Sequence, residues 1–377
     1  MFEQIIAITR NTFYESIRQP IMLVVLLIST VMIILSNPLS AFTMANDQRM
    51  LIDIGMATVF MCGALLAAFI ATTVLGQEIE NRTALTVISK PVGRPIFVLG
   101  KFFGVAGALA LATLYMSLVF MLVELHSVLQ TVRDPLHLPV LTFGIGATII
   151  GIIAAVWCNY FYNKVFASSV ICFMTVLLGL AYFFSLMFSH DFTPQPIFTS
   201  FKGQLWMALF GVFMAIAVLT AIAIATSTRL GQVMTLAVTI GVFLGGLLSD
   251  WYFGQKIQAM KEIWLKRASV QDLTHSEEFI RTIHRTSGEI QTITETIQVA
   301  DVPLSDMAMG SETLMYYLLN IGYSVVPNFQ VLWLSDAVTQ EHIIPSSYLL
   351  KTTIYGVFCI IFALSAAIFL FQRREVG

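Results

Sequence analysis

Eight apolar runs constrain this chain more than any other feature, because each is close to the ~20 residues that an α-helix needs to cross a bilayer. Hydrophobic residues make up 57% of the 377 residues and charged residues only 11%, whereas a soluble domain carries roughly 25% charged residues. We therefore predict an all-α polytopic membrane protein. The predicted spans are 21–38, 51–75, 97–123, 138–158, 165–188, 205–226, 230–249 and 349–371.

The lysines and arginines between these spans are distributed unevenly. With the N-terminus inside, ten fall in cytoplasmic segments: Arg10, Arg18, Arg82, Lys90, Arg94, Lys101, Lys164, Arg229, Arg373 and Arg374. Four fall in or beside the short outer loops: Arg49, Arg133, Lys202 and Lys351. The loop 250–347 is left out, because long loops translocate largely regardless of charge. This positive-inside bias, with an even number of spans, predicts that both termini are cytoplasmic.

The first twenty residues form an amphipathic stretch ahead of the first span. Its apolar face consists of Phe2, Ile5, Ile6, Phe13 and Ile17. A helix of this kind beside a span is typical of one that lies in the membrane interface, and we predict it on the cytoplasmic side.

Residues 76–101 are a polar stretch between the second and third predicted spans. Apolar residues recur in it at helical spacing and predict a short amphipathic helix. They are Leu85, Ile88 and Val92. Pro91 and Pro95 end this helix, because each disfavours the helical conformation in the residue before it, and a new helix is expected near Ile96. From the residues alone, a docking surface and a loop that only sets topology are equally good interpretations.

The long loop 250–347 is expected on the outer side. Residues 255–283 are charged, with apolar residues at helical spacing, and predict a helix. Residues 289–299 fit either a helix or a strand. Residues 314–328 are apolar and aromatic but too short to span, so we predict an interfacial or re-entrant helix that ends at Pro327.

Several sequence motifs are missing. The chain has no phosphate-binding loop, no zinc-binding His-Glu-x-x-His and no Gly-x-Ser-x-Gly, so we predict neither an ATPase site nor a hydrolase. No basic cluster or RNA-binding motif predicts nucleic-acid binding. The four cysteines lie in apolar runs, and the six histidines fall in outer loops or at outer helix ends. His275 and His284 lie near several carboxylates, where solvated surface histidine is favoured over a metal role, so no metal site is predicted. The predicted span interiors hold no charged residue, which argues against an ion-coupled carrier.

The polar stretch resembles the coupling segment of the ABC-2 type permease family. The resemblance rests on Glu78-Ile-Glu80, Ser89-Lys90-Pro91, Arg94 and Gly100-Lys101. It extends to the Pro327-Asn328-Phe329 turn, the Leu334-Ser-Asp336 step and the Arg-Arg-Glu tail that ends at Glu375. The chain departs from the family in having eight predicted spans where six are common, and in the insertion 255–312.

The resemblance implies a permease subunit, with export as the family's tendency, in the cytoplasmic membrane of a prokaryote. It implies a separate ATPase subunit that binds ATP, and a second permease subunit, identical or not. No cofactor is expected in the chain itself. The docking residues that it implies are Glu78, Glu80, Arg82, Lys90, Pro91 and Arg94.

The predicted organisation has four parts, with the coupling helix at about 77–95. They are an interfacial helix at 1–20, a membrane region at 21–249, an extracytoplasmic region at 250–347, and the last span with its tail at 348–377. The alternative function is a non-transporting scaffold or sensor that works through the long outer loop. An ion-coupled carrier is a third and weaker hypothesis.

Overall fold

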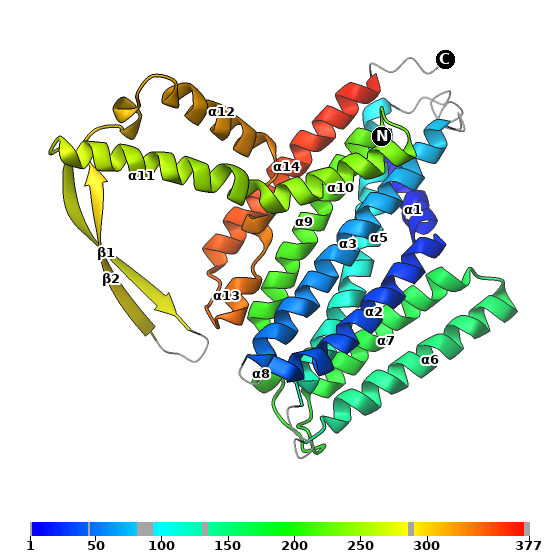
Figure 1. The fold of residues 1–377 in the computed structure, drawn as a ribbon. Coiled ribbons are helices and arrows are strands. Elements are labelled where there is room, and N and C mark those ends of the chain that lie inside the picture. Colours follow the sequence, from blue (N-terminus) through cyan, green and yellow to red (C-terminus); the bar gives the residue numbers. More distant parts are fainter. Residues whose placement is uncertain (1, 44–45, 81–92, 130–134, 286–289, 373–377) are drawn as a thin grey trace. The chain divides into compact units, whose positions relative to one another are not determined.

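The computed structural model describes residues 2–43, 46–80, 93–129, 135–285 and 290–372. The described chain is mostly helical and divides into two compact units, Met1–Ile240 with Ser347–Gly377, and Gly241–Ser346. Figure 1 shows the elements of both units.

The first unit contains most of the long helices. They are α1 (Phe2–Ile17), α2 (Pro20–Ser40), α3 (Asp47–Glu80), α5 (Arg94–His126), α6 (Leu138–Tyr162), α7 (Phe166–Leu186), α9 (Gly203–Ser227), the first part of α10 (Gln232–Ser249) and α14 (Ser346–Gln372). Two short helices, η1 (Ala41–Thr43) and α8 (Ile197–Ser200), lie in its connections. Within the described residues, eight helices are long and apolar enough to cross a membrane. The prediction of a multi-pass helical membrane protein is therefore confirmed.

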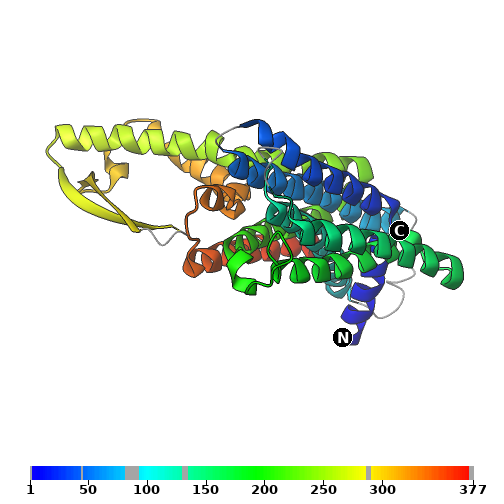
Figure 2. The same cartoon turned by 90° about the horizontal axis from the view of Figure 1, so that it is seen from below.

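The core of this unit lies between α3, α5 and α9 (Figure 1). Glycines let these helices approach closely, as is usual where helices pack in membranes. A Cβ atom on Gly55 would lie 2.1 Å from the ring of Phe120, and one on Gly63 would lie 2.2 Å from Ile216. The helices α6 and α7 form an antiparallel pair that runs together in both views (Figure 1, Figure 2).

The second unit contains the rest of α10 and the region that follows. Helical conformation continues from Gln232 to Val270 through a π-helical turn (Asp250–Gly254) and α11 (Gln255–Val270). The other elements are β1 (Thr274–His284), β2 (Ile290–Ala300), η3 (Leu304–Met307), α12 (Glu312–Val325), η4 (Phe329–Leu332) and α13 (Ser335–Thr339). The helix predicted for 314–328 is confirmed as α12, and its interfacial position stays a prediction.

The helix predicted over 255–283 is only half correct. It ends at Val270, and Thr274–His284 is instead a strand that pairs antiparallel with Ile290–Ala300, from Thr274↔Ala300 to His284↔Ile290. Threonine and isoleucine make up six of the 11 residues of β2 and four of the 11 of β1, which also contains Phe279, and these residue types favour strands over helices. The strand interpretation of 289–299 is therefore the right one.

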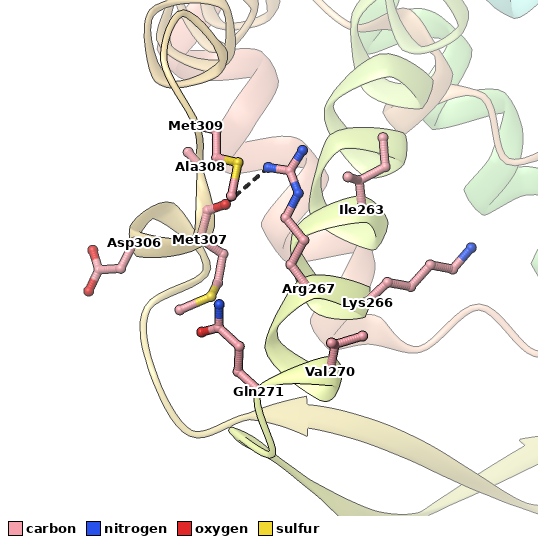
Figure 3. Close-up of a pocket in the computed structure, with 9 residues that line it drawn as sticks. All are labelled: Ile263, Lys266, Arg267, Val270, Gln271, Asp306, Met307, Ala308 and Met309. Carbon is pink, nitrogen blue, oxygen red and sulfur yellow. Dashed lines mark hydrogen bonds between the residues drawn. The ribbon is translucent and has the colours of Figure 1, made fainter.

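An ion pair fixes α11 against α12 in the second unit. Arg267 donates two hydrogen bonds to Glu312, Nη1 to Oε2 at 2.6 Å and Nη2 to Oε1 at 2.8 Å. The indole of Trp264, only 2% exposed, donates to the same carboxylate at 2.9 Å. These bonds hold the pKa of Glu312 down to about 2. Figure 3 shows Arg267 also reaching the carbonyl oxygen of Met307, at 3.1 Å, beside an open cavity of about 480 Å³.

Candidate functional site

The predicted docking residues lie around the junction of α3 and α5, and the structure describes only part of them. Glu78 and Glu80 belong to the last turns of α3 by their backbone. Arg82, Lys90 and Pro91, with the predicted amphipathic helix, lie outside the described residues. Arg94 is the first residue of α5. The structure therefore describes the two helix ends that flank the polar stretch, the end of α3 and the beginning of α5.

Arg94 contacts the end of the last span. Its Nη1 donates to the carbonyl oxygen of Gln372 at 2.6 Å and lies 3.4 Å from that of Phe371. Arg229, in the turn between α9 and α10, donates from Nε to the carbonyl oxygen of Leu370 at 3.0 Å. The last carbonyls of a helix have no partner within the helix and carry its partial negative charge, so two guanidinium groups suit them. We call Arg94 and Arg229 the α14 clamp.

An aromatic contact lies beside the α14 clamp. The rings of Phe97 and Phe371 stack with centroids 5.9 Å apart and planes inclined by 19°. Both side chains are almost fully buried, which adds apolar burial to the polar contacts of the clamp. The first turn of α5 is thus joined to the last turn of α14 by both kinds of contact.

The N-terminal helix α1 packs on the beginning of α5. A Cβ atom on Gly104 would lie 2.5 Å from Cβ of Thr12 and 2.7 Å from the carbonyl oxygen of Thr9, so only glycine fits there without a shift. The hydroxyl of Thr9 donates to the carbonyl oxygen of Gly100 at 3.3 Å. The helix predicted for this stretch is confirmed. Thr9 and Thr12 make this contact together with Ile8 and Phe13, which approach Gly100 and Gly107. Phe2, on the predicted apolar face, is 76% exposed.

A buried lysine forms an ion pair at the same end of the unit. Lys101 is only 2% exposed, and its ammonium lies 3.4 Å from Oε2 of Glu15 on α1. It also lies 5.8 Å from the centroid of Phe97, within the range of a cation–π contact. Because a buried charge that loses its partner is costly, this pair favours one position of α1 on α5.

The other end of α5 holds a second buried charge. Glu124 is 2% exposed and accepts hydrogen bonds from Lys202 and, at 2.9 Å, from Nε2 of Gln48. Nearby in the chain, His137 precedes α6, and burial is the main cause that lowers the pKa of its imidazole, helped by His126. His137 is half-buried at the start of this helix. Among the described residues, no group of three or more His, Cys, Asp or Glu could hold a metal ion.

The beginning of α5, which follows the polar stretch, therefore packs against α1 and α14, two helices that are distant from it in the sequence. The sequence places Arg229, Lys101 and Arg94 on one side of the membrane by charge count alone. It gives no sign that Arg94 meets Gln372, because the two residues are 278 positions apart. The one usable signal is general: a helix end inside a packed protein requires partners for its carbonyls, and arginines near another helix end can supply them.

Comparisons of this chain with protein-family models, with curated proteins and with solved structures find no match. The fold itself defines the class, a multi-pass helical membrane protein.

Proposed function

We propose that this chain is the membrane-spanning permease subunit of an ABC-2 type transporter, and that it exports substrate across the cytoplasmic membrane with ATP hydrolysed by a separate subunit. A second permease subunit, identical or related, completes the transporter. The polar stretch 76–101 is the docking surface for the ATPase, with Glu78, Glu80, Arg82, Lys90, Pro91 and Arg94 as its contact residues. The proposal has the cytoplasm at the Arg94 end of the bundle and both termini there.

One observation carries this proposal: the polar stretch leads directly into a helix that is fixed to two others. Its last described residues form the first turns of α5, which contact α14 through Arg94 and Phe97 and α1 through Gly100 and Gly104. A force applied to the stretch would therefore reach three helices at once. A loop that only sets topology needs no such connection.

The test is co-purification of the protein in mild detergent, followed by identification of the associated chains and an ATPase assay. The informative variant is Arg82→Glu with Lys90→Glu, which reverses two charges on the proposed surface. Arg94 is left unchanged because its loss would disturb the α14 clamp as well as docking. Arg18→Glu is the matched control, since Arg18 is an exposed arginine on the same predicted side of the membrane.

We expect a P-loop ATPase to co-purify in about equal molar amount with the unaltered chain and with Arg18→Glu. It should be lost from the double variant. Retention of the ATPase by the double variant would show that the docking surface lies elsewhere. Absence of an ATPase from the unaltered protein would remove the permease proposal itself.

The second candidate function is a non-transporting scaffold or sensor, and one observation favours it. Residues 241–346 form a compact unit with its own buried tryptophan and ion pair, which is more than a connecting loop requires. The β-hairpin can be replaced by a short Gly/Ser linker, because the amide of Asp301 donates to the carbonyl oxygen of Leu273 at 3.0 Å and these two positions are therefore close. A permease lacking the hairpin keeps ATP-dependent activity, whereas a scaffold that works through this unit loses its function.

A further inference from the structure

A cavity of about 580 Å³ lies in the first unit between α2, α5, α6 and α7. Its volume is within the range of small-molecule sites, roughly 300–1,000 Å³. It is far along α5 from the α14 clamp, near the end that carries Glu124. It is therefore separate from the proposed docking surface.

The wall of the cavity is apolar. Among the described residues that line it, none is Asp, Glu, Lys or Arg. Its hydroxyl groups are already satisfied by protein atoms: Thr30 and Tyr115 share a hydrogen bond of 2.9 Å, and Thr148 donates to the carbonyl oxygen of Gly144 at 2.9 Å. An apolar cavity without free polar groups does not hold ordered water well, so its natural occupant is an apolar group.

Polar side chains gather at the end of the cavity that lies nearest the last residues of α2 and α5. Asn37 lies in the last turn of α2, and its Nδ2 donates to the carbonyl oxygen of Ser127 at 2.7 Å. His126 is the last residue of α5, and its Nδ1 lies 3.2 Å from the same oxygen. A ligand that fits this arrangement has an apolar body and a polar end.

The depth of the cavity corresponds to one leaflet of a bilayer. Along α5 the lining residues run from Tyr115 to His126, and these 11 residue steps span ~16 Å in an α-helix. Half of a hydrocarbon core of ~30 Å is ~15 Å. An extended acyl chain of one leaflet therefore matches the cavity in length as well as in polarity.

The side of the cavity formed by α6 has room for such a chain. A Cβ atom on Gly144 would meet no atom within 4 Å, although Gly144 lines the cavity. Helix α6 packs mainly on α7, and its side chains are largely exposed, as with Ile145 and Ile149. A lipid can therefore enter from the bilayer, past α6.

We propose that this cavity binds one acyl chain of a membrane phospholipid, with the headgroup at Asn37 and His126. The proposal does not depend on the docking of an ATPase. The ligand comes from the bilayer and exchanges with it. Binding in the cavity differs from contact with ordinary surrounding lipid in two ways: it saturates as the lipid concentration rises, and it modifies a defined set of residues.

The experiment uses the full chain in nanodiscs, with a phosphatidylglycerol that carries a diazirine in the middle of one acyl chain. After irradiation, mass spectrometry locates the modified residues and counts the lipids attached to each chain. The blocking variant is Gly144→Phe, which places a ring in the cavity. The matched control is Gly146→Phe, because Gly146 also has no atom within 4 Å of its Cβ position but does not line the cavity.

We expect modification of residues in the cavity wall that saturates at about one lipid per chain as the probe fraction rises. Gly144→Phe should lower it ~10-fold or more, since a phenyl ring excludes at least two methylenes of the chain, and Gly146→Phe should leave it unchanged. If thermal unfolding shows that Gly144→Phe is poorly folded, Ile145→Trp replaces it. Ile145 is another residue of the cavity wall, and we expect the same loss of lipid modification. Modification that rises in proportion to the probe and is insensitive to both wall variants would show surrounding lipid only and overturn the proposal.

Discussion

Replacing Arg94 by alanine should loosen the last turn of α14 without unfolding the protein. The change removes one charged hydrogen bond of 2.6 Å to the Gln372 carbonyl and one cation beside the negative end of a helix. The second contact, at 3.4 Å from the Phe371 carbonyl, is too long to add much. Hydrogen bonds to charged groups and charges at helix ends together suggest about 1–2 kcal/mol at this partly exposed position.

Hydrogen exchange of the amides at 369–372 measures this loss directly. A local opening that becomes easier by about 1–2 kcal/mol exchanges ~5- to 30-fold faster. Arg94→Lys should fall between the wild type and Arg94→Ala, because lysine keeps the positive charge but not the planar fork of donors. The control is Arg18→Ala, because the guanidinium of Arg18 lies 5.7 Å from the centroid of the Tyr14 ring on α1, away from the end of α14. Unchanged exchange in Arg94→Ala, or an equal rise in Arg18→Ala, would refute the clamp.

Three further predictions concern other contacts. Gly104→Ala should destabilise the protein by about 1–3 kcal/mol in thermal unfolding, because its new methyl group overlaps α1, whereas Gly107→Ala, with its nearest atom at 3.4 Å, should cost less. Lys202→Met should destabilise by about 1–3 kcal/mol, because it leaves the carboxylate of Glu124 buried with less compensation, and Glu124→Gln in the same chain should restore most of the loss in a double-mutant cycle. Glu312 has a pKa lowered from its usual 4.5 to about 2, so its ion pair stabilises the second unit fully above pH 4.5 and progressively less as the pH falls towards 2. The amides of α11 should therefore exchange more slowly in the wild type than in Glu312→Gln at neutral pH, and at the same rate in both proteins at low pH.

The spans were predictable because the signal is local. A bilayer requires about twenty apolar residues in one helix, and each predicted run overlaps one of the eight apolar helices, with 165–188 observed as Phe166–Leu186 and the run from 230 beginning at Gln232. The seventh span shows the limit of this signal. Hydropathy ends it at 249, but the helix continues to Val270, because the peptide backbone stays hydrogen-bonded after the sequence becomes polar.

The hairpin and the α14 clamp were not predictable for a different reason. Over 274–283, Phe279, Ile280 and Ile283 fit the spacing of a helix, and only pairing with 290–300 decides for a strand. Arg94 was expected on a docking surface because its neighbours resemble one. Its contact with Gln372 depends on the arrangement of whole helices, which no short pattern contains. The docking residues at 82, 90 and 91 lie outside the described residues, so their role stays a prediction.

Helix α5 connects the two proposals made for this protein. Its 33 residues correspond to ~50 Å of helix, with the α14 clamp at one end and the wall of the acyl-chain cavity at the other. Close contacts at Gly100 and Gly104 leave little space between α1 and α5 in which α5 could bend alone, because packed interiors do not deform continuously. A displacement imposed on the polar stretch would therefore move α5 as a unit and change the shape of the cavity. The two proposals can nevertheless fail separately, since charge reversal at 82 and 90 leaves the cavity intact and Gly144→Phe leaves the docking surface intact.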